Sequence, residues 1–66
     1  MPFAAGDRVE HRTMGPGTVQ RREKGDVHVV YDRIQRNGEH AVGIYDTNWF
    51  NIYPGMLGKL PHTQEK

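Results

Sequence analysis

Residues Val27 to Tyr31 read VHVVY, and this stretch decides the fold. Valine and tyrosine favour strands, and the side chains of a strand alternate between its two faces. Positions 27, 29 and 31 therefore share one face of the predicted strand, and positions 28 and 30 share the other.

On both sides of this strand, glycines and prolines interrupt the chain every few residues, and the whole sequence holds eight glycines and four prolines. They leave no window of about 10 to 12 residues with helical periodicity, so we expect almost no helix. The short runs between the breaks are rich in β-branched and aromatic residues, which is typical of strands. We predict three more strands: Asp7 to His11 with Val9 inward, Gly17 to Glu23 with Val19 inward, and His40 to Tyr45 with Val42 and Ile44 inward and Ala41, Gly43 and Tyr45 on the opposite face.

The rest of the chain is predicted to connect and close this sheet. Asp32 to Glu39 is polar and turn-prone, which indicates a loop or hairpin end. Met56, Leu57 and Leu60 indicate a short final strand or a single 3₁₀ turn. The prediction is an all-β fold, a small five-stranded barrel of the SH3 or Tudor type over residues 1–60, followed by a flexible polar tail over residues 61–66.

Composition excludes several classes of chemistry. A chain of 66 residues holds one small domain, and it contains neither cysteine nor serine. Disulfides, thiolate zinc sites and serine or cysteine nucleophiles are therefore ruled out. The four histidines are scattered without ligand spacing, so we expect no metal, no cofactor and no enzymatic activity. No apolar run approaches the ~20 residues of a membrane span, and the first residues lack a basic leader, so we expect a cytoplasmic protein.

Charge is nearly balanced overall but uneven along the chain. The formal net charge is +1, which argues against a polycation that binds phosphates through bulk charge. Seven basic and four acidic residues lie between Arg8 and Arg36, whereas Asn37 to Gly58 holds two acids and no lysine or arginine. This asymmetry places the basic groups in the first half of the chain.

An aromatic segment follows the fourth predicted strand. Tyr45, Trp49, Phe50 and Tyr53 lie within nine positions, and some of these rings must fill the core. Strand alternation would place Trp49 and Phe50 on opposite sides, leaving one of them near the surface. Trp49 is therefore either a core residue or part of a binding surface. The predicted binding surface combines Tyr45, Trp49 and Tyr53 with a basic rim of Arg21, Arg22, Arg33 and Arg36.

The first half of the chain resembles a known family of small barrels. The residues that carry the resemblance are Phe3, Gly6-Asp7-Arg8-Val9, His11, Gly15, Gly17-Thr18-Val19, Val27, Val29 and Tyr31-Asp32. They are similar to the opening of the Tudor-like domain at the C-terminus of UvrD/PcrA-type helicases and in CarD-type transcription regulators. The resemblance implies a barrel that binds RNA polymerase or another protein. The second half departs from that pattern and looks more like small stand-alone bacterial proteins.

A shorter resemblance involves Phe50 to Pro54. This segment, FNIYP, is similar to the Val-Gln-Ile-Tyr-Pro segment of plasmid-borne type II dihydrofolate reductases, which are SH3-like chains assembled as tetramers. The resemblance implies that Ile52 and Tyr53 line a site for folate and NADPH. Asn51 stands where those enzymes have the glutamine that clamps the ligands.

These observations favour a non-catalytic interaction module. We expect a protein partner, with the transcription or DNA-repair machinery as the candidates, and a monomer or weak homodimer that does not bind membranes. A nucleic-acid-binding module is the first alternative, and a reductase-like tetramer is the second.

Overall fold

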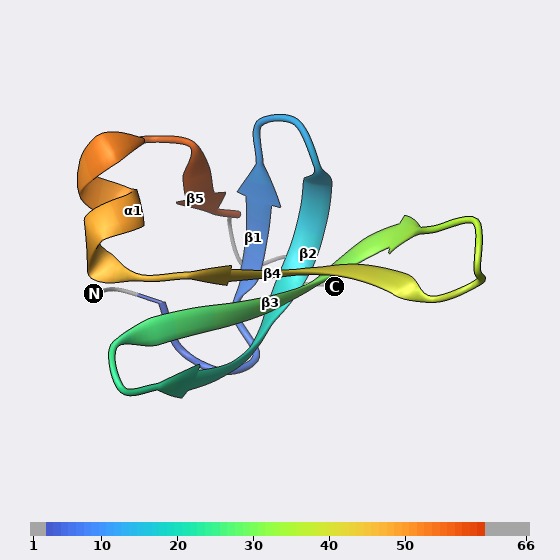
Figure 1. The fold of residues 1–66 in the computed structure, drawn as a ribbon, viewed down its shortest axis with the longest axis horizontal. Helices are drawn as coiled ribbons and strands as arrows, with labels where there is room; N and C mark the ends of the chain where they lie inside the picture. Colours follow the sequence, from blue (N-terminus) through green and yellow to red (C-terminus); the bar gives the residue numbers. More distant parts are fainter. Residues whose placement is uncertain (1–2, 61–66) are drawn as a thin grey trace, which may run out of the picture.

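The computed structural model describes residues 3–60, which form one sheet and one short helix (Figure 1). The chain begins with one short and two long strands, continues through a fourth strand into the helix, and returns in a final short strand. The elements are β1 (Arg8–His11), β2 (Gly15–Glu23), β3 (Asp26–Ile34), β4 (His40–Tyr45), α1 (Thr47–Ile52) and β5 (Leu57–Lys59).

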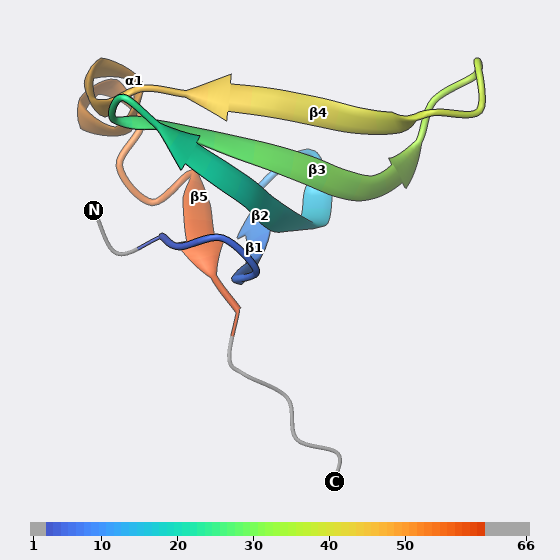
Figure 2. The same ribbon diagram turned by 90° about the horizontal axis from the view of Figure 1, so that it is seen from below.

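The five strands form one sheet in the order β4-β3-β2-β1-β5, and every described pairing is antiparallel. β3 and β4 form one layer, with β1 and β5 lying beneath it in Figure 2, so the long strand β2 belongs to both parts. This arrangement confirms the predicted all-β class and the number of strands. Between residues 3 and 60, no helix is long and apolar enough to cross a membrane.

The core lies between the two parts of the sheet. Val9, Val19, Val27, Val29 and Tyr31 are each at most 1% exposed, which confirms the inward direction predicted for Val9 and Val19 and the shared face predicted for positions 27, 29 and 31. β2 and β3 bring these side chains together because Val19 pairs with Val29 and Gly17 pairs with Tyr31. Phe3, Ala41 and Leu57 complete the buried set.

The predicted facing of β4 is wrong. Ala41 is buried, whereas Val42 and Ile44 are 67% and 61% exposed. The physical reason is the Tyr45 ring, which folds back over Gly43 and occupies the interior space on that side of the strand. Small residues at 41 and 43 leave room for large rings, so the larger aliphatic side chains are directed outward.

Two hairpins connect the central strands. Lys24 and Gly25 both have positive φ, 52° and 86°, as a two-residue type I′ turn requires. β3 continues to Ile34, which pairs with His40, so residues 32 to 34 are strand and not loop as predicted. The connection is confined to residues 35–39, where the Gly38 N–H donates to the Gln35 carbonyl oxygen.

An ion pair on the outer surface joins β1 to β3 across β2. The Arg8 guanidinium donates two hydrogen bonds to the Asp32 carboxylate, at 3.0 and 2.6 Å, and a third to Thr18 Oγ1. This pairing lowers the pKa of Asp32 below its ordinary value, because the hydrogen bonds stabilise the ionised carboxylate.

The C-terminal half contains the main departure from the prediction. Residues Thr47–Ile52 form a helix, although we predicted almost none. The expected final strand is present as β5, in which Leu57 is buried and pairs with His11. The predicted flexible tail, residues 61–66, lies outside the described residues.

Candidate functional site

The helix α1 begins where the side chain of Asp46 caps it. The Asp46 Oδ1 accepts a hydrogen bond of 2.7 Å from the Trp49 backbone N–H, the usual role of an aspartate at this position. Asp46 follows β4 directly, so α1 starts at the end of that strand (Figure 1). The cap therefore fixes the first residue of α1 and, with it, the directions in which the Trp49 and Phe50 side chains point.

An aromatic cluster gathers around Trp49. Its indole lies 4.2 Å from the ring centre of Tyr45 and 5.0 Å from that of Phe50. Tyr53 and His11 lie 5.5 and 6.0 Å from the same indole. The spacings to Phe50 and Tyr53 are those of favourable aromatic pairs, each contributing about 0.5–1.5 kcal/mol beyond simple burial. The cluster ties α1 to both β1 and β4.

Trp49 and Phe50 are both half-buried, so the alternation predicted for them is wrong. That expectation assumed a strand, in which neighbouring side chains point to opposite faces. In a helix, neighbours are about 100° apart, so both rings reach the core edge. Phe50 stacks on Phe3 at 5.5 Å, while Trp49 contacts Tyr45. Trp49 is thus neither wholly core nor wholly surface.

The exposed part of this region is a small hydrophobic surface at the end of α1. Ile52 is 59% exposed and Tyr53 is 46% exposed. Trp49 is one helical turn from Ile52, and its indole contacts the Tyr53 ring. We call Trp49, Ile52 and Tyr53 the α1 surface.

Beneath the α1 surface, two tyrosines share a hydrogen bond. The hydroxyls of Tyr31 and Tyr45 lie 2.6 Å apart. Burial raises the pKa of Tyr31 above its ordinary value, and the hydrogen bond to Tyr45 raises it further. The Tyr31 hydroxyl therefore stays protonated where a free tyrosine would ionise.

This raised pKa predicts an alkaline loss of stability. The unfolded chain releases the Tyr31 proton near pH 10, its ordinary pKa, whereas the folded chain retains it. The contribution of Tyr31 to the free energy of unfolding should therefore not change with pH below about pH 10, and it should fall at higher pH. Urea unfolding at pH 8 and pH 11 measures the effect. We expect Tyr31→Phe to lose less stability over this interval than the wild type, with Tyr53→Phe as the matched control. An equal loss in Tyr31→Phe would contradict this assignment.

His11 belongs to the aromatic cluster although it was not among the predicted site residues. Its Nδ1 lies 3.1 Å from the Thr13 backbone N–H and 3.2 Å from that of Met14, so it accepts from both donors. The ring proton therefore sits on Nε2. The ring lies 6.0 Å from Tyr45 and packs edge-on against Tyr31. Its spacing of two residues from Val9 on β1 is a sequence signal that would have placed it on the core face.

The predicted basic rim does not form a single patch around these rings. Arg33 lies on β3 and Arg36 in the β3–β4 loop, at the opposite end of that hairpin from α1 (Figure 1). Arg21 is exposed near the end of β2 and pairs with Glu23 at 3.2 Å. Arg22 is linked to the cluster through Phe3: its guanidinium donates to the Phe3 carbonyl oxygen at 3.3 Å, and the Phe3 ring stacks on Phe50.

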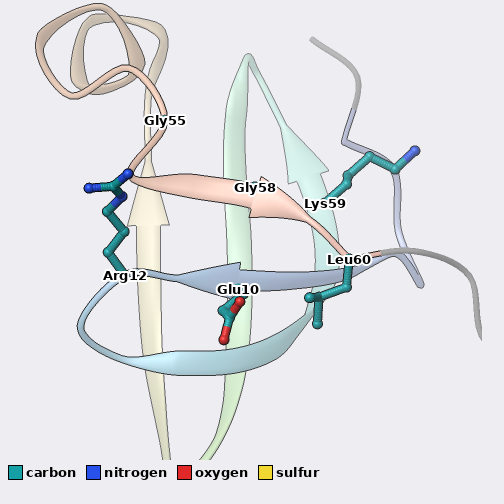
Figure 3. A pocket seen from close by; sticks show the side chains of 6 residues that line it. All are labelled: Glu10, Arg12, Gly55, Gly58, Lys59 and Leu60. Carbon is teal, nitrogen blue, oxygen red and sulfur yellow. The ribbon is translucent and has the colours of Figure 1, made fainter.

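A hollow of about 220 Å³ lies over the paired strands β1 and β5. It is lined by Glu10, Arg12, Lys59 and Leu60, together with two glycines (Figure 3). The Arg12 and Lys59 side chains point away from one another, and Lys59 pairs with Asp7 at 3.5 Å. A catalytic site requires charged groups that converge on a common point, and the groups around this hollow do not converge.

The described part of the chain holds no group of three or more histidine and carboxylate side chains able to bind a metal ion. The segment that resembles the reductases forms the end of α1 and the residues after it, with Asn51, Ile52 and Tyr53 all exposed.

Comparison with protein-family models, characterised proteins and solved structures finds no match to this chain. The resemblances to helicase, regulator and reductase barrels therefore remain predictions.

Proposed function

We propose that this chain is a non-catalytic module that binds a protein partner through the α1 surface. The observation that carries the proposal is the exposure of Ile52 and Tyr53 beside a half-buried Trp49. Tryptophan and tyrosine are enriched in the centres of protein interfaces, where they bury large areas at a low entropic cost. We place the protein in the cytoplasm, in keeping with its lack of cysteine.

Rigidity supports this role. The Asp46 cap, the contact between Trp49 and Tyr45, and the hydrogen bond between Tyr31 and Tyr45 hold the base of the α1 surface in one arrangement. A surface that is already ordered loses little conformational freedom when a partner binds. The end of α1 can therefore act as a preformed anchor.

A barrel of the SH3 or Tudor type is part of the same proposal. The strand order leaves β4 and β5 at the two edges of the sheet. The ring contact between His11 of β1 and Tyr45 of β4 spans the interior at 6.0 Å, and this contact supports closure by side chains. The resemblance to CarD-type regulators makes RNA polymerase the first partner to test.

The distribution of charge favours protein over nucleic acid. Proteins that bind single strands combine stacking rings with adjacent cations that follow the phosphates. Here Arg33 and Arg36 lie at the far end of the β3–β4 hairpin, and Arg21 pairs with Glu23. Arg22 alone of the predicted rim lies near the cluster, where its guanidinium donates to the Phe3 carbonyl oxygen. α1 itself has no basic residue in its last turn.

The test is affinity capture from native cell extract with matched variants. Ile52→Lys places a charge in the α1 surface, whereas Ile34→Lys changes a residue that is similarly exposed, at 54%, but distant from α1. We expect Ile52→Lys to reduce recovery of a discrete protein by about tenfold or more, and Ile34→Lys to leave it unchanged. Equal recovery with all three proteins would contradict the proposal.

A parallel binding assay with single-stranded and duplex oligonucleotides separates the first alternative. Binding that weakens steeply as salt rises, and that Ile52→Lys leaves intact, would favour a nucleic-acid ligand. The proposal predicts no such binding.

A further inference from the structure

β4 is an open sheet edge with little of the usual protection: its pairing with β3 is regular from Tyr45 to Val42, and the one irregularity lies between Val42 and His40. Sheets commonly protect their edges with lysine, proline, bulges or very short strands. The other edge strand, β5, has only three residues and ends in Lys59. β4 has six residues, HAVGIY, with no lysine, arginine or proline. Figure 2 shows no other element of the described chain beside its outer edge.

The outer face of this edge is apolar. Val42 and Ile44 are among the most exposed large hydrophobic side chains of the described residues, at 67% and 61%. Val42 pairs with Val30 on β3, so the apolar surface continues inward from the edge at this position, whereas Ile44 pairs with His28. An exposed apolar face of this kind on an unpaired strand marks an interaction site.

The sequence of β4 and its following residue is complementary to itself. We propose that β4 pairs antiparallel with β4 of a second copy of this chain, about a twofold axis at Gly43. In this register Val42 faces the partner's Ile44, Ala41 faces the partner's Tyr45, and His40 faces the partner's Asp46. On the outer face the aliphatic side chains of positions 42 and 44 meet, while Ala41 and Tyr45 stay in the core of their own copy. His40 Nδ1 already contacts the Tyr31 carbonyl oxygen and Asp46 Oδ1 caps α1, so His40 Nε2 and Asp46 Oδ2 are the atoms that would meet at each end.

Neighbouring registers lack this complementarity. Each side chain stays on its own face of the sheet only when the register changes by an even number of residues. A twofold axis at Val42 would set His40 against the partner's Ile44, and an axis at Ile44 would set Val42 against the partner's Asp46. Each alternative places an ionisable group against an aliphatic one. The axis at Gly43 is therefore the favoured arrangement.

A second copy fits this edge better than the end of the same chain. The last described residue, Leu60, donates its backbone N–H to the Arg8 carbonyl oxygen of β1, so the chain leaves β5 at the opposite edge of the sheet. A six-residue strand pair buries little area, and small interfaces are weak. We expect a dimer that forms reversibly as the concentration rises. The proposed pairing uses β4 and Asp46 but none of the three residues of the α1 surface, so this inference does not depend on the proposed function.

The test is oxidative cross-linking, for which a chain without cysteine is well suited. Val42→Cys and Ile44→Cys are made as separate proteins, oxidised alone and as an equal mixture. The proposed register sets position 42 opposite the partner's 44, so we expect at least about tenfold more covalent dimer in the mixture than in either protein alone. No excess in the mixture would overturn the proposal.

Sedimentation of the free protein provides the second measurement. We expect Ile44→Lys to remain monomeric at concentrations where wild type and Ile52→Lys dimerise, because only the first places a charge in the strand pair. Dimerisation of Ile44→Lys equal to that of wild type would overturn the proposal. A loss of partner capture in Ile52→Lys without a change in dimerisation separates this interface from the α1 surface.

Discussion

Replacing Gly43 with alanine is expected to destabilise the fold by about 2–3 kcal/mol, because a side chain at this position collides with the Tyr45 ring. A Cβ at Gly43 would lie 2.6 Å from Cζ of Tyr45 and closer still to its hydroxyl oxygen. The ring has little room to move, because it packs on Trp49 at 4.2 Å and its hydroxyl is bonded to Tyr31. For a domain of this size, such a loss lowers the melting temperature by roughly 10 °C or more.

Gly58→Ala is the matched control. Gly58 lies in β5, and a Cβ there would meet no atom within 4 Å. Thermal unfolding followed by circular dichroism compares the two variants directly. We expect Gly58→Ala to melt close to the wild type, since Gly58 does not adopt the left-handed backbone. Equal melting of Gly43→Ala and wild type would show that Tyr45 does not lie over Gly43.

Trp49→Ala is the second substitution with a large expected effect. The indole is half-buried and contacts Tyr45, Phe50 and Tyr53. Removing a fully buried tryptophan costs about 3–5 kcal/mol, so a half-buried one should cost about 2 kcal/mol. Trp49→Ala should therefore remain folded at room temperature but unfold at lower urea concentration, and it should lose partner binding.

Tyr53→Ala distinguishes the two roles of Trp49. Tyr53 is 46% exposed, and its described ring contact is with Trp49. We expect its removal to cost less than about 1 kcal/mol while still weakening partner binding. Urea unfolding of both variants is the measurement. If Trp49→Ala were as stable as Tyr53→Ala, the indole would have no structural role.

Strand positions in the first half of the chain followed from alternation alone. Val27, Val29 and Tyr31 share one face as predicted, and that face is buried, because nothing in their neighbourhood competes with the two-residue period of a strand. Val9 and Val19 are buried for the same reason. The end of β3 was placed too early, since the pairing of Ile34 with His40 depends on a partner strand and not on local polarity.

β4 shows why hydrophobicity alone was misleading. Val42 and Ile44 are the larger aliphatic residues, so the sequence favoured them for the interior. Space inside is occupied instead by the Tyr45 ring, which reaches back across Gly43. The facing of β4 was thus decided by the volume of the Tyr45 ring and by the space that Ala41 and Gly43 leave for it, which a strand pattern does not reveal.

The helix was missed because it is shorter than the window of about 10 to 12 residues in which helical periodicity can be detected. Six residues, TNWFNI, complete fewer than two turns. Its best sequence signal was Asp46, three positions before Trp49, which is a typical helix-capping position. Once the helix is recognised, Trp49 and Ile52 fall one turn apart, and the α1 surface follows. The separation of Arg33 and Arg36 from that surface depends on the length of the β3–β4 hairpin.

The most direct test of the account is site-specific photo-cross-linking in the native cell. A photoreactive amino acid replaces Ile52 in one protein and Ile34 in another, two positions of similar exposure on different parts of the molecule. The account predicts a discrete, nuclease-resistant protein adduct from position 52 and none from position 34. Equal adducts from both positions, or a nuclease-sensitive adduct at position 52, would contradict it.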